Sequence, residues 1–208
     1  MQPLTSNSVY QQVLQGEWDE LHPRLRTYFG PPPPGTIGVG HGTYDTAGSR
    51  VRLLRPVFAV TARRQILFPE VGSDVPFTVV NAPQPDGTLT ASRTFAFPHR
   101  MRVMRDTLRV IDGRLVERIG KGGLLEMTLD VLVDRSGMRL VSRGMSLRLG
   151  SLTVPLPPFA QVTVDERADG DRQYVDVRVR SRLVGEIFRY AGTFTYDHVA
   201  RGAMDGGI

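Results

Sequence analysis

The chain of 208 residues contains no cysteine. This absence excludes disulfides, thiolate nucleophiles, and zinc or iron–sulfur sites that cysteine would hold. A chain of this length buries roughly 70% of the surface that its unfolded form exposes, so it needs no cross-link to be stable. Single-domain β-sandwiches and barrels often reach this length, and we therefore expect one domain.

Long apolar runs are also missing. The longest apolar stretch, residues 57–68, is interrupted by two arginines and is shorter than the ~20 residues that a membrane-spanning helix needs. The amino-terminal residues show no basic segment followed by an apolar run, so they do not resemble a secretory signal. We expect a cytoplasmic protein without a transmembrane segment.

Lysine is almost absent, because Lys121 is the only lysine among the 26 basic residues that give the chain a net charge of +5. The arginines are scattered through strand-like segments instead of forming one dense run, which is typical of solvated strand faces. A nucleic-acid partner would need a clustered basic stripe with interleaved aromatic residues. The sequence therefore argues against a nucleic-acid partner.

Helical periodicity is confined to the amino-terminal part of the chain. Apolar residues recur at helical spacing from Ser8 to Phe29, after a cluster of serine and asparagine that can cap a helix. We predict one helix, or two short helices broken near Gly16 or Pro23. The prolines of residues 31–34 end this segment, because proline cannot donate a backbone hydrogen bond.

After these prolines the apolar residues alternate with period two, which predicts strands. Four turn-forming pairs interrupt the alternation, namely Asp86-Gly87, Asp112-Gly113, Ser136-Gly137 and Asp169-Gly170. Glycine after a short polar residue supplies the positive φ angles of tight hairpin turns. A bulge near Gly144 would reconcile the two phases of the strand over residues 138–149. The pattern therefore predicts an antiparallel meander of hairpins.

Bulges bend strands, and a long bent meander can curl until its edges meet. We predict a mainly β fold, in which a strongly curved antiparallel sheet closes into a lipocalin-like barrel or half-barrel with an N-terminal helical segment. The expected parts are a helical segment over residues 1–30, a barrel-like domain over residues 31–199 and a disordered tail over residues 200–208. Residues 51–71 fit either a helix or a strand, and the proline-rich residues 152–159 fit an irregular corner or edge.

The sequence contains no standard catalytic motif. The glycine-rich residues 38–42 lack the spacing of a dinucleotide-binding loop and fit close backbone approach instead, and no P-loop, nucleophile elbow or zinc-protease helix is present. The four histidines are far apart without a metal-ligand spacing, so we expect no metal and no cofactor. His41, close to Tyr44 and Asp45, is the best histidine candidate for acid–base chemistry. Alternatively, it is an exposed residue beside a glycine-rich turn.

Two ionisable residues lie in phase with aromatic side chains. Read with period two, the face that contains Glu186 also contains Phe188, Tyr190 and Phe194, and the face of Arg93 contains Phe95. A carboxylate among rings loses hydration, so it must pair with a cation or its pKa must rise. Arg93 is a candidate partner for Glu186, and its forked donors can also anchor a ligand carboxylate or phosphate. A structural salt bridge, or a Glu186 in water at a strand end, explains the same pattern.

The aromatic face is either ordinary core or the wall of a pocket for an apolar ligand. The ligand-binding candidates are Arg93, Phe95, Phe188, Tyr190, Phe194 and Tyr196. If the protein is an enzyme, the catalytic candidates are Glu186, Tyr190 and His41. The first hypothesis is binding of a hydrophobic or amphipathic small molecule, such as a lipid, isoprenoid or polyketide-like compound. The second is a cofactor-independent acid–base enzyme, of the cyclase, isomerase or lyase type, that uses the same cavity.

Five segments of the chain together resemble a bacterial family known as domain of unknown function 4166. They are VYQQVLQGEWDELHPRLRTYF (Val9 to Phe29), SRTF (Ser92 to Phe95), LVERIG (Leu115 to Gly120), VPLPP (Val154 to Pro158) and VGEIFRYAG (Val184 to Gly192). In that family the domain sometimes follows a saccharopine-dehydrogenase-like domain. The resemblance supports Arg93 and Tyr190 as site residues and implies a third hypothesis, a non-catalytic module that works with a dehydrogenase-like partner.

Overall fold

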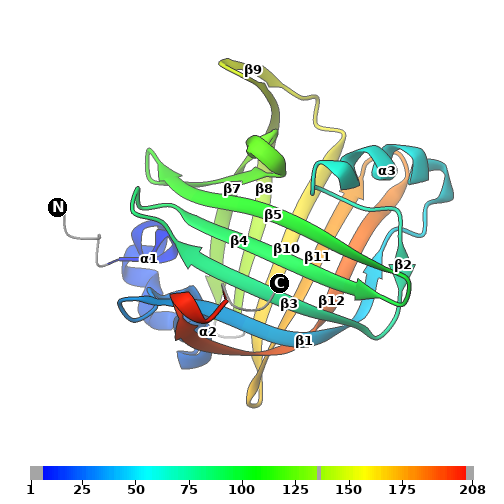
Figure 1. Cartoon of the computed structure of the whole chain (residues 1–208). Helices are drawn as coiled ribbons and strands as arrows, with labels where there is room; N and C mark the ends of the chain where they lie inside the picture. The colour runs from blue at the N-terminus through cyan, green and yellow to red at the C-terminus, as the bar shows by residue number, and fades with distance from the viewer. Residues whose placement is uncertain (1–6, 135–136, 205–208) are drawn as a thin grey trace.

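The structure, a computed structural model, describes residues 7–134 and 137–204. Within these residues, ten antiparallel strands form a barrel: β1 (Thr36–Gly48), β3 (Val75–Pro83), β4 (Leu89–Phe97), β5 (Arg100–Ile111), β6 (Arg114–Ile119), β7 (Leu125–Asp134), β8 (Gly137–Leu149), β10 (Ala160–Asp169), β11 (Arg172–Ser181) and β12 (Gly185–Ala200). Their order is β10-β11-β12-β1-β3-β4-β5-β6-β7-β8, and β8 pairs with β10 to close the ring (Figure 1). The prediction of a mainly β fold that closes into a barrel is confirmed.

Two short strands extend the barrel. β2 (Val71–Gly72) pairs with β1, and β9 (Leu152–Pro155) pairs with β8. β9 is exposed throughout and lies at one end of the strand order. The proline-rich residues 152–159 therefore form an edge strand and an irregular connection to β10, as predicted.

The predicted hairpin turns join consecutive strands. Asp112 and Gly113 form the two-residue turn between β5 and β6 with φ angles of 49° and 73°, a conformation that glycine adopts without steric cost. The turns β3–β4 and β10–β11 contain the pairs Asp86-Gly87 and Asp169-Gly170. In the β7–β8 turn, Ser136 lies outside the described residues. The predicted bulge is confirmed, because the register between β7 and β8 shifts by one residue next to Gly144.

The glycine-rich part of β1 allows β12 to approach closely. A Cβ atom on Gly42 would lie 2.2 Å from the carbonyl oxygen of Thr193 in β12. A Cβ atom on Gly38 would lie 1.6 Å from the hydroxyl oxygen of Tyr196. Both distances are far below van der Waals contact. Gly42 is required because the obstacle there is the backbone of β12, whereas a side chain at Gly38 would have to displace the ring of Tyr196. The segment serves close packing inside the barrel, as the sequence predicted.

The amino-terminal segment forms three short helices in the described chain: α1 (Val9–Leu14), the 3₁₀ helix η1 (Gln15–Glu20) and α2 (Pro23–Phe29). Ser8 caps α1 in a capping box with Gln11. The chain breaks after α1 at Gln15, where φ is 49°, and α2 begins at Pro23. Proline suits the first position of a helix because its missing N–H has no intrahelical partner there. The sequence predicted one helix, or two helices broken near Gly16 or Pro23, and the structure has a break near both residues.

These helices cover one end of the barrel (Figure 1). α1 contacts β5 and β6, η1 contacts β7, and α2 contacts β10, so together they reach across the ring. The ring of Tyr28 in α2 packs against Phe194 and Tyr196 of β12, with centroid distances of 5.4 and 4.7 Å. Buried apolar side chains of the helices therefore close this end.

Residues 51–71, which fit either a helix or a strand, are mainly helical. They contain the 3₁₀ helix η2 (Arg52–Leu54), α3 (Arg55–Arg63) and the first residue of β2. α3 lies on the side of the barrel away from α1 and α2 (Figure 1). Its buried Phe58 packs edge-on against Phe188 of β12, with the ring centroids 6.0 Å apart. The 3₁₀ helix η3 (Lys121–Gly123) joins β6 to β7.

The carboxyl-terminal residues of the described chain continue beyond β12 as the 3₁₀ helix η4 (Arg201–Met204). The backbone N–H of Arg201 donates to the carbonyl of Gly35 at 3.0 Å, and its Nη2 donates to the carbonyl of Pro83 at 2.6 Å. Of the tail over residues 200–208, for which we predicted disorder, residues 205–208 lie outside the described part. Within the described ranges, no helix is long and apolar enough to cross a bilayer.

Candidate ligand-binding cavity

The barrel encloses a cavity of about 450 Å³. Side chains from every barrel strand line it, together with residues of α2, η2 and α3. The wall formed by β10 and β11 consists largely of the inward-facing residues Val162, Val164, Val175, Val177 and Val179. The interior of an eight-stranded barrel is either filled by its own side chains or holds one small ligand. In the described chain this barrel has ten strands, and valines are small, so space remains in its middle.

The cavity opens at the end where α3 lies. Three of its lining residues are about half exposed, and they belong to segments far apart in sequence: Val57 of α3, Phe159 before β10 and Val184 before β12. The lining residues Tyr28 and Phe194, next to the amino-terminal helices, are buried. The cavity therefore has a closed end at the helices and a mouth at α3.

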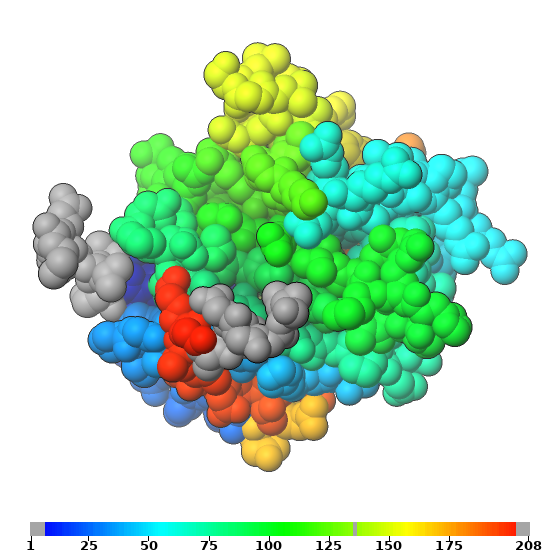
Figure 2. Space-filling view, viewed as in Figure 1, coloured from blue at the N-terminus to red at the C-terminus, as the bar shows by residue number. Residues whose placement is uncertain are grey.

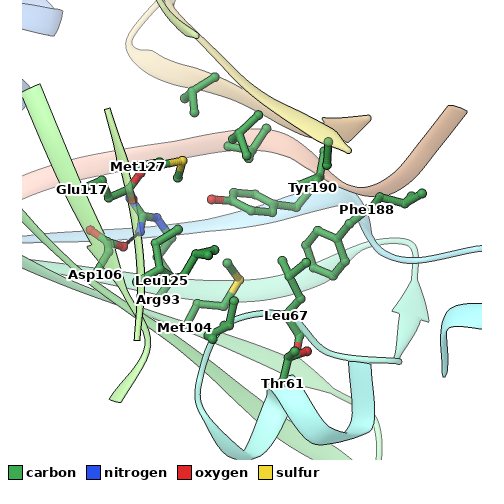
Figure 3. A pocket seen from close by; sticks show the side chains of 18 of the residues that line it. Thr61, Leu67, Arg93, Met104, Asp106, Glu117, Leu125, Met127, Phe188 and Tyr190 are labelled. Carbon is green, nitrogen blue, oxygen red and sulfur yellow. Dashed lines mark hydrogen bonds and ion pairs between the residues drawn. The ribbon is translucent and has the colours of Figure 1, made fainter. Parts of the chain in front are cut away.

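A polar cluster lies inside the cavity on three neighbouring strands. It consists of Arg93 of β4, Asp106 of β5 and Glu117 of β6 (Figure 3). Arg93 donates through Nη1 to Oδ2 of Asp106, forming an ion pair in which 20% of the arginine and 4% of the aspartate side chain are exposed. Oδ1 of Asp106 is buried and has no hydrogen-bond partner among the described residues. Buried polar atoms are rarely left unpaired, so this oxygen is a candidate ligand contact.

Burial changes the protonation of the carboxyl groups in the cavity. It raises the pKa of the Glu117 carboxyl to about 8, with a further rise from the charge of Asp106 and an opposing effect of Arg93. Burial also raises the pKa of the Glu166 carboxyl on β10 to about 7, although Nε2 of Gln173 donates to it at 2.5 Å. At neutral pH, Glu117 therefore carries a proton that it can donate in a hydrogen bond.

Arg93 and Asp106 form the charged part of the cluster. Burial lowers the pKa of the Arg93 guanidinium, but the Asp106 carboxylate and the nearby tyrosines together outweigh burial and raise the pKa well above its usual value. Burial raises the pKa of Asp106, and the charge of Arg93 opposes that rise. The Asp106 carboxylate therefore balances the charge of the buried Arg93 guanidinium and fixes its position.

Tyr190 completes the polar end of the cavity. Its hydroxyl points toward the cluster from β12 (Figure 3), and it forms no hydrogen bond with another described residue. Burial raises the pKa of this hydroxyl well above its usual value, so it keeps its proton. It is therefore a second neutral donor beside Glu117.

The structure brings together four of the six predicted ligand-binding residues on the cavity wall, namely Arg93, Phe188, Tyr190 and Phe194. Phe95 is fully buried behind the wall, where its ring packs against Tyr44 and Phe68 with centroid distances of 5.2 and 4.8 Å. Tyr196 lies near α2, and its hydroxyl accepts a hydrogen bond from Nδ2 of Asn81 at 3.2 Å. Phe95 and Tyr196 support the barrel without lining the cavity.

Two of the three predicted catalytic residues lie outside the cavity. His41 is exposed on the outer face of β1, with Nδ1 3.2 Å from the hydroxyl oxygen of Thr78. Glu186 is exposed at the start of β12, so the predicted pair between Arg93 and Glu186 is wrong. The register between β11 and β12 shifts by one residue at Ile187, and this bulge reverses the strand phase between Phe188 and Glu186.

Three carboxyl residues of the cavity were not among the predicted site residues. Asp106 lies two residues from both Met104 and Leu108, in the apolar inward phase of β5. Glu117 in β6 and Glu166 in β10 occupy inward phases in the same way. An acid in the apolar phase of a regular strand is the signal that could have identified them. Within the described residues, no group of three or more His, Asp or Glu is placed to hold a metal ion.

The fold and the cavity place this protein in the class of closed antiparallel β-barrels with an enclosed, mainly apolar cavity. The chain belongs to the family described as domain of unknown function (DUF4166), whose model matches residues 21–194, and this confirms the predicted resemblance. The chain is also similar to the uncharacterised protein YndH of Bacillus subtilis (strain 168), with 27% identity over 201 residues that cover 90% of this chain and 96% of YndH. No solved structure matches the chain, so the predicted likeness to lipocalins stays a prediction.

Proposed function

We propose that the protein binds a hydrophobic or amphipathic small molecule, of the lipid, isoprenoid or polyketide-like class, inside the barrel. The observation that supports this proposal is the cavity of about 450 Å³ with apolar walls and a polar cluster. Small-molecule sites are commonly concave, about 300–1,000 Å³ in volume, and mostly apolar with a few placed polar groups. An amphipathic molecule would place its polar group beside Arg93 and its apolar part along the valines.

The polar cluster suits a neutral polar group better than an ion. The charge of Arg93 is already balanced by Asp106. Glu117 and Tyr190 carry protons at neutral pH and can donate hydrogen bonds, while Oδ1 of Asp106 can accept one. A hydroxyl or carbonyl group of the ligand can use these partners without bringing a second net charge into an apolar cavity. We therefore favour a lipid-like alcohol or ketone over a carboxylate or phosphate.

Native mass spectrometry of the protein purified from its own host tests the proposal. We expect a bound small molecule that is released when the protein unfolds. Val177→Trp places a large ring in the cavity, because Val177 lines it, and this variant should lose the bound molecule. Leu132→Trp adds the same ring at an exposed position of β7 and should keep it. A folded Val177→Trp variant that retains the molecule would exclude the cavity as the binding site.

One observation favours a second candidate function, cofactor-independent acid–base catalysis in the same cavity. Glu117 has a pKa raised to about 8 and belongs to the polar cluster of the cavity. The hydroxyl of Tyr190 points toward this cluster (Figure 3). A group with a pKa near the working pH is suited to proton transfer, which contributes ~10²–10⁴-fold to a rate. In this version Glu117 replaces the exposed residues His41 and Glu186 as the proton donor or acceptor.

Variants that keep the shape of the cavity separate binding from catalysis. If the protein is an enzyme, Glu117→Gln and Tyr190→Phe should retain the co-purified molecule but stop its conversion. If the wild-type protein leaves that molecule chemically unchanged, binding alone describes the function. The third hypothesis, association with a dehydrogenase-like protein, stays a prediction.

A further inference from the structure

Large apolar side chains are exposed around the mouth of the cavity. Leu53 in η2 is 83% exposed and Leu183 in the β11–β12 turn is 93% exposed. Both stand beside residues that line the mouth, since Leu54 and Val184 belong to the cavity wall. Side chains this exposed contribute little to the stability of the barrel. We refer to residues 52–63, Phe159 and residues 182–184 as the mouth surface.

Contacts between its three segments make the mouth surface continuous. Val57, Phe159 and Val184 line the same opening. The backbone N–H of Arg182 donates to the carbonyl of Phe159 at 3.3 Å, which joins the β11–β12 turn to the connection before β10. The contact between Phe58 and Phe188 joins α3 to β12. The exposed apolar groups therefore surround one opening on a fixed frame.

The charges of the mouth surface have one sign. Residues 52–63 and 182–184 contain no Asp or Glu, and their cations are Arg52, Arg55, Arg63 and Arg182. All four side chains are exposed, and none forms an ion pair with another residue that the structure describes. Arginines on the barrel wall, in contrast, pair with acids, as Arg102 does with Glu70 at 2.6 Å. The first acid after the β11–β12 turn is Glu186, which lies outside the mouth surface as defined.

The hairpin of β8 and β9 adds further exposed apolar side chains at the mouth end of the barrel. Figure 2 shows α3 and the β8–β9 hairpin as two projections on the same side of the molecule. The hairpin carries the exposed side chains Leu149 and Leu152 at its tip. Its edge strand has no partner beyond β8 in the described chain. Two apolar projections therefore stand at the end of the barrel where the cavity opens.

We propose that the mouth surface docks onto the surface of an anionic lipid bilayer. Interfacial proteins insert apolar side chains at the boundary between headgroups and acyl chains, while cations beside them attract anionic headgroups. Leu53 and Leu183 with the four arginines of the mouth surface provide both contributions. A second copy of this chain fits less well, because it would bring the same unpaired cations against this surface. The proposal does not depend on the identity of the molecule in the cavity.

Vesicle flotation with the full chain tests the proposal. The probes are vesicles of phosphatidylcholine alone and vesicles in which part of the phosphatidylcholine is replaced by phosphatidylglycerol. We expect at least tenfold tighter binding to the anionic vesicles, and weaker binding as the salt concentration rises. Arg55→Gln and Arg182→Gln should each weaken this binding about fivefold. The double variant Leu53→Ser/Leu183→Ser should weaken it at least tenfold.

Matched controls lie away from the mouth. Leu132→Ser removes an apolar side chain that is 55% exposed near the far end of β7. Arg114→Gln removes an exposed arginine at the start of β6. Both controls should bind anionic vesicles as the wild type does. Absence of binding, equal binding to both kinds of vesicle, or equal losses in the controls would overturn the proposal. The proposal would also be overturned if the wild-type protein does not float with vesicles but forms oligomers, and if the double variant Leu53→Ser/Leu183→Ser abolishes these oligomers. The mouth surface would then be an interface between copies of the chain.

Discussion

Glu117→Gln should make the protein more stable at alkaline pH and leave its stability nearly unchanged at acidic pH. Glutamine has the size of a protonated glutamate and cannot ionise. The pKa of the Glu117 carboxyl rises from 4.5 to about 8 on folding, mainly because of burial. Between these two values the folded protein holds a proton that the unfolded chain releases, so the free energy of unfolding falls as the pH rises. Above pH 8 the folded protein must carry the buried charge.

The size of this effect follows from the pKa change. Each unit of pKa difference corresponds to about 1.36 kcal/mol, so a change from 4.5 to about 8 sets a ceiling of about 5 kcal/mol at pH 9. The carboxyl borders a cavity with room for water, and hydration lowers the cost of ionisation. We therefore expect Glu117→Gln to gain about 1–3 kcal/mol over the wild type at pH 9.

Chemical denaturation of both proteins at intervals from pH 5 to pH 9 measures the difference in the free energy of unfolding. Glu166 is unchanged in the variant, so its own titration is common to both proteins. Glu20→Gln, a substitution at an exposed position of η1, is the matched control and should differ from the wild type equally at every pH. If the difference in the free energy of unfolding between Glu117→Gln and the wild type does not change from pH 5 to pH 9, then Glu117 does not hold a proton in the folded state.

Three further predictions concern the frame of the cavity and its exterior. Asp106→Asn should lower the free energy of unfolding by about 3–5 kcal/mol, because it leaves the buried charge of Arg93 without a counter-ion; a loss below 1 kcal/mol in denaturation would contradict this. Gly42→Ala should cost about 3 kcal/mol or more, since the new Cβ would overlap the backbone of β12, and an unchanged melting temperature would show that β1 can move away. His41→Ala and Glu186→Gln should each change stability by less than about 0.5 kcal/mol and leave the amount of co-purified molecule unchanged, because both side chains are exposed outside the cavity.

The regular parts of the barrel could be predicted from the sequence because one rule governs them. Where a strand is uninterrupted, period-two alternation identifies its inward residues, as it did for Phe188, Tyr190 and Phe194. The same rule was wrong for Glu186, because the bulge at Ile187 reverses the phase over a single step. The position of a bulge depends on how a strand pairs with its neighbour, and this pairing cannot be derived from the sequence of one strand alone.

Residues 51–71 show a different limit. Their apolar residues fit both helical and strand periodicity, and short apolar segments are ambiguous between the two. In the structure the segment forms α3, and its buried Phe58 packs against Phe188 of β12, a contact that requires the folded barrel. The contact joins positions 130 residues apart in sequence, so local pattern has no access to it.

Local chemistry determined the helix caps, the hairpin turns, the glycine-rich approach of β1 to β12 and the alternation that makes each strand amphipathic. These features depend on neighbouring residues and on backbone sterics, which the order of amino acids contains directly. The pairing register of β4 with β5 decided that Arg93 meets Asp106, and the bulge at Ile187 kept Glu186 outside. Only the closed barrel decided that Glu117 is buried enough for its pKa to rise and that a cavity remains. Register is a property of two strands, and burial and enclosed volume are properties of the whole ring, so no single strand's sequence contains them.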